Sequence, residues 1–383
     1  METEPQHQTG TRRRGMRTGI GLVAAVWTSL HLYVGQRLLA ATPLGLGWRV
    51  LGWVGVLVLI LAPFVALAAG RTERLPAKRG LEVAGFIAMG LSSLLIVFAL
   101  VGDVLHVRTW LGIAAFRLAV VGGAVTVLLV GLWRARRPAL VRVVDVPIAR
   151  LPSDLEGFRI AQLSDLHVGP TLKRAFVERV VHTTNGLAPD LIALTGDVAD
   201  GFPRALRDDV APLAALSAPL GKYFVTGNHE YYWDAAGWVR ELERLGFHAL
   251  VNAHRVIRRG SGRVLLAGVT DLSAPAGGPG PASDPAAALA GAPESDVRVL
   301  LAHQPKSAFA ARKVGFDLQL SGHTHGGQYF PFNLLVRLFQ PFVAGLHRLE
   351  AMWLYVSRGT GYWGPPLRLG APAEITLIQL TRA

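Results

Sequence analysis

Four long apolar stretches dominate the first part of this chain. They cover roughly residues 19–39, 50–70, 81–101 and 111–133. About 20 apolar residues in a helix are enough to cross a bilayer core of about 30 Å. Backbone N–H and C=O groups inside lipid need internal partners, so a stretch that crosses must be helical. We therefore expect about four transmembrane helices within residues 19–134, preceded by a basic cytoplasmic segment, residues 1–18. For the first and fourth stretches, a buried core helix is the alternative.

Composition agrees with a membrane part and narrows the partners. Hydrophobic residues make up 51% of the chain, and the mean hydropathy is +0.36, which is high for a soluble domain. Residues 1–150 hold 17 Lys and Arg against 6 Asp and Glu, whereas residues 151–383 hold 22 against 20. A nucleic-acid-binding domain needs a basic surface on its folded part, so we exclude nucleic acid as the main partner. The chain has no cysteine, so any metal must be held by oxygen and nitrogen atoms.

Basic residues flank alternate ends of the apolar stretches. They cluster in residues 12–17, 71–79 and 134–142, and the other two loops hold only Arg37, Arg49 and Arg108. By the positive-inside rule, both termini lie in the cytoplasm, which places the C-terminal half on the cytoplasmic face of the cell membrane. The alternative is export through a twin-arginine signal. No small-residue cleavage site follows the arginines, and further apolar stretches do, which argues against export.

The C-terminal half has the pattern of an α/β domain. Short apolar runs predict strands at residues 159–163, 191–194, 223–225, 264–269, 297–302, 318–320, 354–356 and 375–380, with helices near 172–186, 204–216 and 235–245. Alternation of strands and helices indicates parallel pairing through right-handed crossovers. The late strands lack long helices between them, which predicts a second, mixed sheet.

We expect a linker over residues 135–154 and the domain over 155–383. The Ala-, Gly- and Pro-rich residues 273–293 predict a surface loop, with an ordered substrate lid as the alternative.

Five polar segments each follow one of these strands. They are Asp165-Leu-His167, Gly196-Asp197-Val-Ala-Asp200, Gly227-Asn228-His229-Glu230, His303 and Gly322-His323-Thr-His325. In α/β sheets, ligands bind in the crevice outside the carboxyl ends of the strands. Segments distant in sequence are therefore expected to converge at one edge of the domain.

The residue types in these segments predict a metal centre. Carboxylate and imidazole ligands suit Mn, Fe and Zn, whereas an all-oxygen set would suit Ca or Mg. Two ions about 3.5–4 Å apart need a bridging carboxylate, and they can clamp a phosphoryl group while activating a hydroxide. One Asp-x-His is common by chance, but Gly-Asn-His-Glu and Gly-His-Thr-His are much less so. The five segments in this order predict two divalent metal ions and a phosphohydrolase.

With these motifs, residues 155–383 resemble the calcineurin-like metallophosphoesterase superfamily. The resemblance implies two mixed β-sheets sandwiched between helices. It implies that one metal is bound by Asp165, His167, Asp197 and His325, and the other by Asp197, Asn228, His303 and His323. Asp197 would bridge the two ions. His229 would contact the phosphate or protonate the leaving oxygen, and Asp200 would orient His229.

Two further motifs, Gly-Gly-Gln328 and Val-Ser-Arg358-Gly, make the chain similar to the bacterial membrane-associated branch of this superfamily. That branch implies phosphodiester or pyrophosphate hydrolysis on, or near, lipid-linked substrates. Arg358 is a candidate phosphate contact. Residues 329–342 are strongly apolar and follow the last predicted ligand. They are expected to be a buried helix and loop of the domain core, and the alternative is a segment that dips into the bilayer interface.

Three functions are compatible with these features. The first is a membrane-anchored, two-metal phosphoesterase with membrane lipids as partners and a lipid-linked substrate. The second is a tethered phosphoesterase for soluble substrates such as nucleotides. The third is an inactive membrane sensor or scaffold, and the retention of every expected ligand argues against it.

Overall fold

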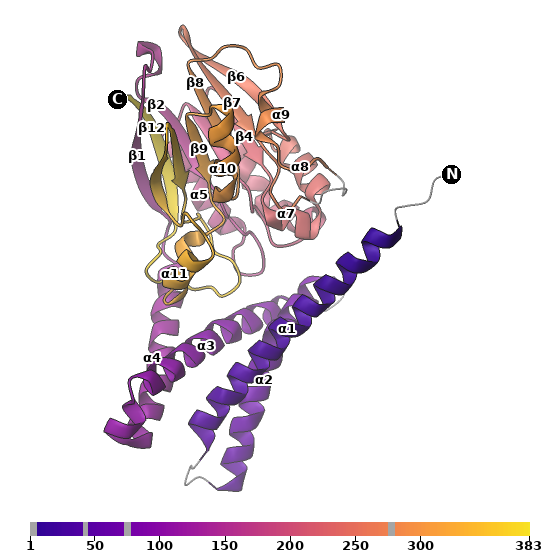
Figure 1. Ribbon diagram of the computed structural model, residues 1–383, viewed down its shortest axis with the longest axis vertical. Helices are drawn as coiled ribbons and strands as arrows, with labels where there is room; N and C mark the ends of the chain where they lie inside the picture. Colours follow the sequence, from indigo (N-terminus) through magenta and orange to yellow (C-terminus); the bar gives the residue numbers. More distant parts are fainter. Residues whose placement is uncertain (1–5, 41–44, 73–77, 275–279) are drawn as a thin grey trace. The chain divides into compact units, whose positions relative to one another are not determined.

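The computed structural model describes residues 6–40, 45–72, 78–274 and 280–383, with side chains from residue 21 onward. The chain divides into two compact units, Met1–Leu129 and Val130–Ala383. Figure 1 gives the order of the elements along the chain. The division between a helical part and an α/β part agrees with the change of pattern in the sequence.

The N-terminal unit consists of long helices. They are α1 (Gln6–Leu39), α2 (Leu46–Gly70), α3 (Lys78–Val104) and α4 (Val107–Ala135), of which the last continues into the second unit. Within the described residues, α2, α3 and α4 are long and apolar enough to cross a membrane. The fourth expected stretch, residues 19–39, is also helical and lies within α1, and its crossing of a membrane stays a prediction.

Small residues and the ion pair between Arg37 and Asp103 bring helices of this unit together. A Cβ on Gly85 of α3 would lie 2.4 Å from Cβ of Ala66 in α2, so only glycine allows this approach. Close backbone contact through small residues is a common way to pack membrane helices. Arg37 of α1 pairs with Asp103 of α3 at 2.7 Å. These contacts are structural and contain none of the predicted metal ligands.

The C-terminal unit contains two six-stranded sheets. The first has the order β1 (Leu140–Ile148), β12 (Glu374–Arg382), β2 (Phe158–Leu163), β3 (Leu191–Thr195), β4 (Lys222–Val225), β5 (His248–Ala249). The second has the order β10 (Gly345–Leu349), β11 (Met352–Val356), β9 (Leu318–Ser321), β8 (Val297–Leu301), β7 (Gly262–Gly268), β6 (Ala253–Arg259). Strands β2 to β5 are parallel, as are β7, β8, β9 and β11, whereas β12 is antiparallel to β2. Both sheets are mixed, as expected.

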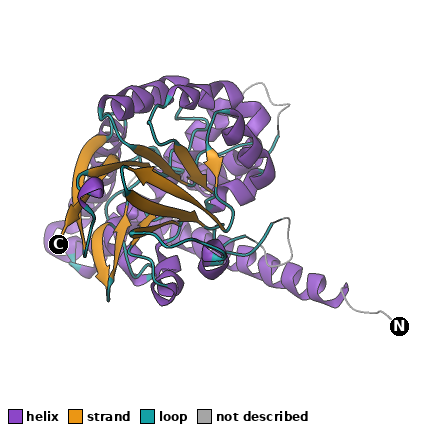
Figure 2. Cartoon of the chain, turned by 90° about the horizontal axis from the view of Figure 1, so that it is seen from above, coloured by secondary structure: helices purple, strands orange, loops and turns teal. Residues whose placement is uncertain are grey.

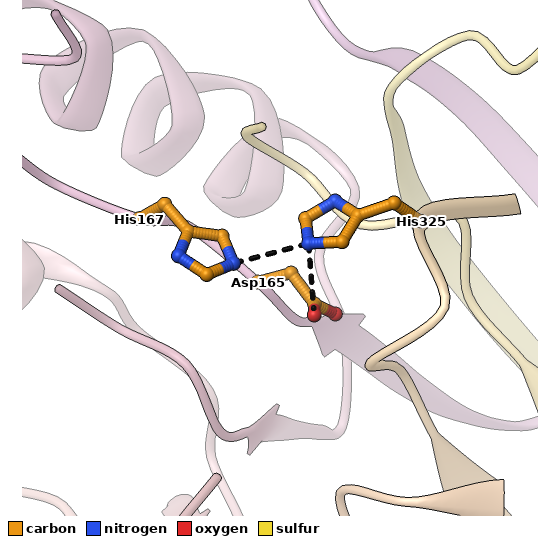
Figure 3. A group of neighbouring side chains, drawn as sticks. All are labelled: Asp165, His167 and His325. Carbon is orange, nitrogen blue, oxygen red and sulfur yellow. Dashed lines mark hydrogen bonds and ion pairs between the residues drawn. The ribbon is translucent and has the colours of Figure 1, made fainter. Parts of the chain in front are cut away.

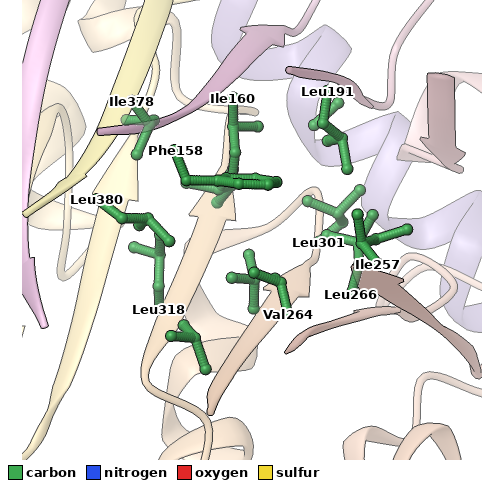
Figure 4. Packing of buried hydrophobic residues seen from close by; sticks show 14 of the residues in the cluster. Phe158, Ile160, Leu191, Ile257, Val264, Leu266, Leu301, Leu318, Ile378 and Leu380 are labelled. Atoms are coloured by element: carbon green, nitrogen blue, oxygen red, sulfur yellow. The ribbon is translucent and has the colours of Figure 1, made fainter. Parts of the chain in front are cut away.

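The two sheets pack face to face, with helices on their outer sides (Figure 2). The central core joins Ile160 and Leu191 of the first sheet to Val264 and Leu318 of the second, all fully buried (Figure 4). The first sheet is covered by α5 (Arg174–Gly186), α6 (Pro203–Val210) and α8 (Ala235–Arg244), and the second by α9 (Pro285–Leu289) and α10 (Ala308–Ala311). Short helices α7 (Asn228–Trp233) and α11 (Phe332–Leu335) complete the domain, with 3-10 segments Ser153–Leu155, Ala211–Ala215, Pro305–Ser307, Arg312–Val314, His325–Gly327 and Val336–Leu338. The expected sandwich of two mixed sheets between helices is confirmed.

Three segments differ from the expectation. Residues 135–154 are not a linker throughout, because β1 lies within them and pairs with β12. Part of the expected loop, residues 273–293, forms α9, while residues 275–279 lie outside the described part. The expectation that residues 329–342 are buried is wrong for most of their apolar side chains, although Tyr329 is buried. Apolar character indicates a surface that avoids water, but it does not say whether protein or lipid covers that surface.

Candidate metal centre

The five polar segments meet at one edge of the sandwich. Asp165, Asp197 and Asn228 follow the carboxyl ends of β2, β3 and β4, and His303 and His323 follow those of β8 and β9. Parallel pairing within each sheet places these ends side by side. Because both sheets present this edge to the same crevice, the two sheets share one polar cluster, as the sequence predicts.

The first ligand group contains Asp165, His167 and His325 (Figure 3). All three side chains are buried. Nε2 of His325 lies 3.0 Å from Nε2 of His167 and 3.4 Å from Oδ1 of Asp165. Two ring nitrogens and a carboxylate oxygen that converge in this way form a donor set suited to a divalent ion.

The second ligand group contains Asp197, His303 and His323, with Asn228 beside them. Oδ2 of Asp197 lies 3.2 Å from Nε2 of His303. Oδ1 of Asn228 lies 2.9 Å from Nδ1 of His323 and 3.2 Å from Nε2 of His303. The amide oxygen therefore faces both imidazoles, where it can complete the donor set.

Asp197 lies between the two groups. Its Oδ2 atom is 3.7 Å from Nε2 of His167 in the first group as well as 3.2 Å from His303 in the second. Burial raises the pKa of this carboxyl, but the imidazoles of His303, His229 and His167 outweigh burial and hold the pKa well below its usual range. A carboxylate that stays charged between two ligand groups is suited to bridge two cations.

Hydrogen bonds orient the ligand imidazoles. Nδ1 of His303 lies 2.8 Å from the carbonyl oxygen of Thr195, and Nδ1 of His167 lies 3.2 Å from Oδ1 of Asp200. Each acceptor favours the tautomer with the proton on Nδ1, so the Nε2 lone pair points into the site. Metal-binding histidines are usually held in this way.

Glu230 joins two of the motif loops, a role that the sequence analysis did not assign. Its fully buried carboxylate accepts hydrogen bonds from the backbone N–H groups of Asp197 at 3.0 Å, Val198 at 2.8 Å and Gly227 at 2.6 Å. Burial and the charge of Asp197 raise its pKa to about 7, against the effect of these bonds. The acidic last position of Gly-Asn-His-Glu was the available signal.

Motif glycines allow the loops to approach each other. A Cβ on Gly227 would lie 2.2 Å from Oδ1 of Asp197, and one on Gly322 would lie 2.1 Å from Oδ2 of Asp165. Any side chain at either position would displace a ligand carboxylate. The glycines of Gly-Asn-His and Gly-His-Thr-His therefore make room for the donor set.

His229 and Asp200 form a pair beside the ligand groups. Nδ1 of His229 lies 2.6 Å from Oδ1 of Asp200. Burial lowers the pKa of His229, but the charges of Asp197 and Asp200 and the hydrogen bond outweigh burial and raise the pKa to about 9. Asp200 in turn has a pKa well below its usual range, because the two imidazoles that it contacts overcome the effect of its burial. Without bound metal, the imidazole is therefore positively charged at neutral pH.

Arg368 is a second residue that the sequence analysis did not identify. The side chain is fully buried, and its guanidinium donates hydrogen bonds to the carbonyl oxygens of His325, Gly361 and Ala371. Nη2 also lies 3.2 Å from Nδ1 of His325. Arginine suits such a site because its planar group presents five donors in fixed directions. Arg368 therefore fastens a ligand loop to the C-terminal loops, and no local motif indicates this.

The structure accounts for Gln328 and gives Arg358 an internal partner. Gln328 exchanges hydrogen bonds with the backbone of Trp363, at 2.9 and 3.0 Å, and the Trp363 ring lies 5.7 Å from that of His229. Gln328 therefore fixes the loop that carries an aromatic ring beside the site. Arg358 pairs with Glu374 at 2.9 Å. A phosphate contact by Arg358 stays a prediction.

The donor set fits two divalent ions. Within each group the ligand atoms lie within 4.8 Å of one another. Asp165, His167, Asp197, His323 and His325 all have positive φ, between 46° and 72°. Such backbone costs about 1–3 kcal/mol per residue and persists where the surroundings hold it, often at functional sites. The ligand loops thus hold backbone conformations that L residues rarely adopt, and they present their side chains to one cluster.

Several known proteins are similar to this chain. A sequence profile described as calcineurin-like phosphoesterase matches residues 158–327. A Danio rerio protein named transmembrane protein with metallophosphoesterase domain is 41% identical over 279 residues, covering 70% of this chain and 64% of that protein. An uncharacterized metallophosphoesterase of Campylobacter jejuni is 37% identical over 270 residues, covering 69% of each. A solved structure, the 5′-nucleotidase precursor from Thermus thermophilus, has 18% identity and a TM-score of 0.37, covering 58% of this chain and 54% of that one.

This chain belongs to the calcineurin-like phosphoesterase family. It is a membrane-associated member, with three apolar helices in the described residues and relatives named as transmembrane proteins. The chain spans 64% of the length of the Danio rerio relative and 60% of a Bos taurus relative of the same name.

Proposed function

We propose that this protein hydrolyses a phosphodiester or pyrophosphate bond of a lipid-linked substrate, with two divalent ions, at the cytoplasmic face of the membrane. The observation that carries the proposal is the position of the buried Asp197 carboxylate between two ligand groups. A single metal site does not need a shared carboxylate, whereas a two-metal site does. The basic flanks of the apolar stretches support the cytoplasmic side.

The chain's own residues hold and orient the reacting groups. Asp165, His167 and His325 with Asp197 would hold one ion, and Asn228, His303 and His323 with Asp197 would hold the other. Bound Mn, Fe or Zn would neutralise phosphate charge and supply the nucleophile from water, for which the cluster itself offers no side chain. The glycine contacts and the bonds from Glu230 keep the donors in place without rearrangement.

His229 would act on the leaving oxygen. Its ring lies beside the ligands, since the ring centroids of His229 and His167 are 4.6 Å apart, and its backbone N–H donates to Oδ1 of Asp197 at 2.9 Å. The 2.6 Å bond to Asp200 keeps the proton on Nδ1, and Nε2 lies 3.9 Å from Oδ2 of Asp197. A cationic imidazole there can bind the phosphate and donate a proton to the departing oxygen.

The test uses the full chain in lipid nanodiscs loaded with Mn²⁺. Hydrolysis of bis-p-nitrophenyl phosphate is measured together with the number of metal ions bound per chain. Asp197→Asn should remove activity and reduce the bound metal, because it takes the charge from both ligand groups. Asp208→Asn, on the exposed surface of α6, is the matched control and should behave as the wild type. Full activity in Asp197→Asn would refute the two-metal site.

A second candidate is a tethered phosphoesterase for soluble anions such as nucleotides. A pocket is lined by Phe202, Arg204 and Arg240, of which the first two follow Asp200 closely in the sequence. Its arginines favour the binding of an anionic group. Two other arginines of the pocket, Arg207 and Arg244, pair with Glu241. Rates on nucleotides and on lipid phosphodiesters decide between the candidates: a preference for nucleotides in nanodiscs would favour this one.

A further inference from the structure

A group of large apolar side chains is exposed next to the metal centre. These residues, called the 330–339 surface, are Phe330, Phe332, Leu334, Leu335, Leu338 and Phe339, on α11 and the turn that follows. Leu338 and Phe339 are 75% and 73% exposed. Soluble proteins rarely leave such a contiguous apolar group uncovered, so it marks an interaction surface.

Strand topology shows which edge of the domain the membrane segment enters. Leu140, the first residue of β1, pairs with Glu374 of β12, and Thr376 of β12 pairs with Gln162 at the end of β2. The start of β1 is therefore level with Asp165 and the other ligand-bearing strand ends. Only residues 136–139 separate β1 from α4. The ligand edge is thus the edge at which α4 ends.

The last turn of α4 carries the marks of a membrane interface. Trp133 is 54% exposed, and the guanidinium of Arg137 lies 3.8 Å from the centre of its ring. Arg134 and Arg136 are also exposed. Tryptophan and basic residues concentrate at the headgroup level of bilayers. The residues that contact this turn therefore lie at or near the same level.

A short chain of contacts joins this turn to the 330–339 surface. The backbone N–H of Arg368 donates to the carbonyl oxygen of Gly131 at 3.2 Å, and Leu367 packs on Gly131. The next residue, Leu369, accepts a hydrogen bond from the N–H of Phe330 at 3.0 Å. Arg337, within the apolar segment, is exposed and adds a positive charge suited to anionic headgroups.

We propose that the 330–339 surface inserts into the leaflet in which α4 ends, so that the metal centre opens onto the bilayer. The occupant is lipid, because the contacts continue from a membrane-spanning helix and the rim is cationic. The ring of Trp363 is 40% exposed and lies 5.7 Å from that of His229, and Gln328, which directly precedes the apolar segment, donates a hydrogen bond to the carbonyl oxygen of Trp363. An acyl chain can then stay in the bilayer while its phosphate reaches the ligands. This route for substrate rests on the proposed function, whereas the insertion does not.

Site-specific fluorescence tests the insertion without reference to activity. Because the chain has no cysteine, Leu338→Cys can be labelled alone with bimane. Arg258→Cys on β6 is the control, since it is exposed and β6 and α11 lie at opposite ends of the domain (Figure 1). The full chain is placed in vesicles of phosphatidylcholine and phosphatidylglycerol. The label is quenched from the lipid by nitroxide-bearing acyl chains and from water by iodide.

We expect several-fold stronger lipid quenching at position 338 than at 258, and the reverse for iodide. Equal iodide quenching at both positions would overturn the proposal, because the surface would lie in water. Protection from both quenchers would also overturn it, because a second protein surface would then cover these residues.

The substrate route has its own readout. Bis-p-nitrophenyl phosphate and a diacylglycerol p-nitrophenyl phosphodiester share a leaving group and differ in the anchor. Leu338→Asp combined with Phe339→Asp should lower the rate on the anchored ester relative to the soluble ester several-fold. An unchanged ratio would overturn the route. If the wild type cleaves neither ester, the proposed function fails, while the quenching result still decides the insertion.

Discussion

Asp200→Asn separates proton donation from metal binding. Oδ1 of Asp200 lies 2.6 Å from Nδ1 of His229 and 3.2 Å from Nδ1 of His167. Asparagine keeps an oxygen in nearly the same place, so both imidazoles retain an acceptor. The negative charge is lost, and with it the main reason why the imidazole of His229 stays protonated so close to a metal centre.

The size of the effect follows from the pKa of His229. It is raised from 6.5 to about 9 against the opposing effect of burial. One pKa unit corresponds to about 1.4 kcal/mol, so the surrounding carboxylates outweigh burial by a net of about 3.5 kcal/mol. Asp197 and Asp200 share this effect, and Asp200 also supplies the hydrogen bond. We expect Asp200→Asn to remove roughly half, about 2 kcal/mol.

The assay compares two phosphodiesters with different leaving groups. A p-nitrophenolate departs without a proton, whereas an alkoxide needs one. A loss of about 2 kcal/mol corresponds to roughly thirtyfold, so Asp200→Asn should lower kcat on an alkyl ester by about this factor, a part of what general acid catalysis contributes. On the p-nitrophenyl ester the loss should stay below about tenfold, the lower limit for disturbing a group that orients a metal ligand.

Equal losses on both esters would refute the assignment of His229 as the proton donor. Asp200 would then act through His167, and the bound metal would fall in parallel with activity. Asp209→Asn is the matched control, because Asp209 is in an ion pair with Lys173 outside the site. Its rates on both esters should equal those of the wild type.

Three further outcomes follow from buried contacts. Glu230→Ala leaves three backbone N–H groups without their acceptor, so urea unfolding of the C-terminal unit should show a loss of about 4 kcal/mol, and an unchanged midpoint would contradict this role. Gly322→Ala places a Cβ 2.1 Å from Oδ2 of Asp165, so elemental analysis should find less than one metal ion per chain. Gly186→Ala, with open space around its Cβ, should bind as much metal as the wild type. The free energy of unfolding of the metal-free protein should fall by up to about 3 kcal/mol as the pH rises from about 6.5 to 9. The pKa of His229 is higher in the folded than in the unfolded protein, so its contribution is complete below this range and lost above it. His229→Asn should flatten this part of the pH profile of thermal unfolding, and an unaltered slope would show that His229 does not titrate there.

Most central strands were predictable because the signal is local. Strands such as β3 and β8 are short apolar runs buried on both faces, and their sequence shows this directly. The edge strand β1 was missed because it is mostly exposed on its first half and carries Arg142 and Asp145. Its partner β12 lies more than two hundred residues away in sequence. No local pattern specifies that pairing.

The long apolar helices were predictable from the same kind of local signal. The stretches at residues 50–70, 81–101 and 111–133 lie within α2, α3 and α4, and the stretch at residues 19–39 lies within α1.

By itself, the sequence determined the chemistry: the ligand types, their order, and their place at strand ends all follow from motifs that are local. The tertiary structure decided which atoms meet. It brought Asp197 between two ligand groups, made Glu230 and Arg368 the fasteners of loops distant in sequence, and exposed residues 330–339 at the edge where α4 ends. The physical reason is that a motif fixes which groups can bind a metal, whereas distances, tautomers and exposure depend on packing between segments that the sequence separates.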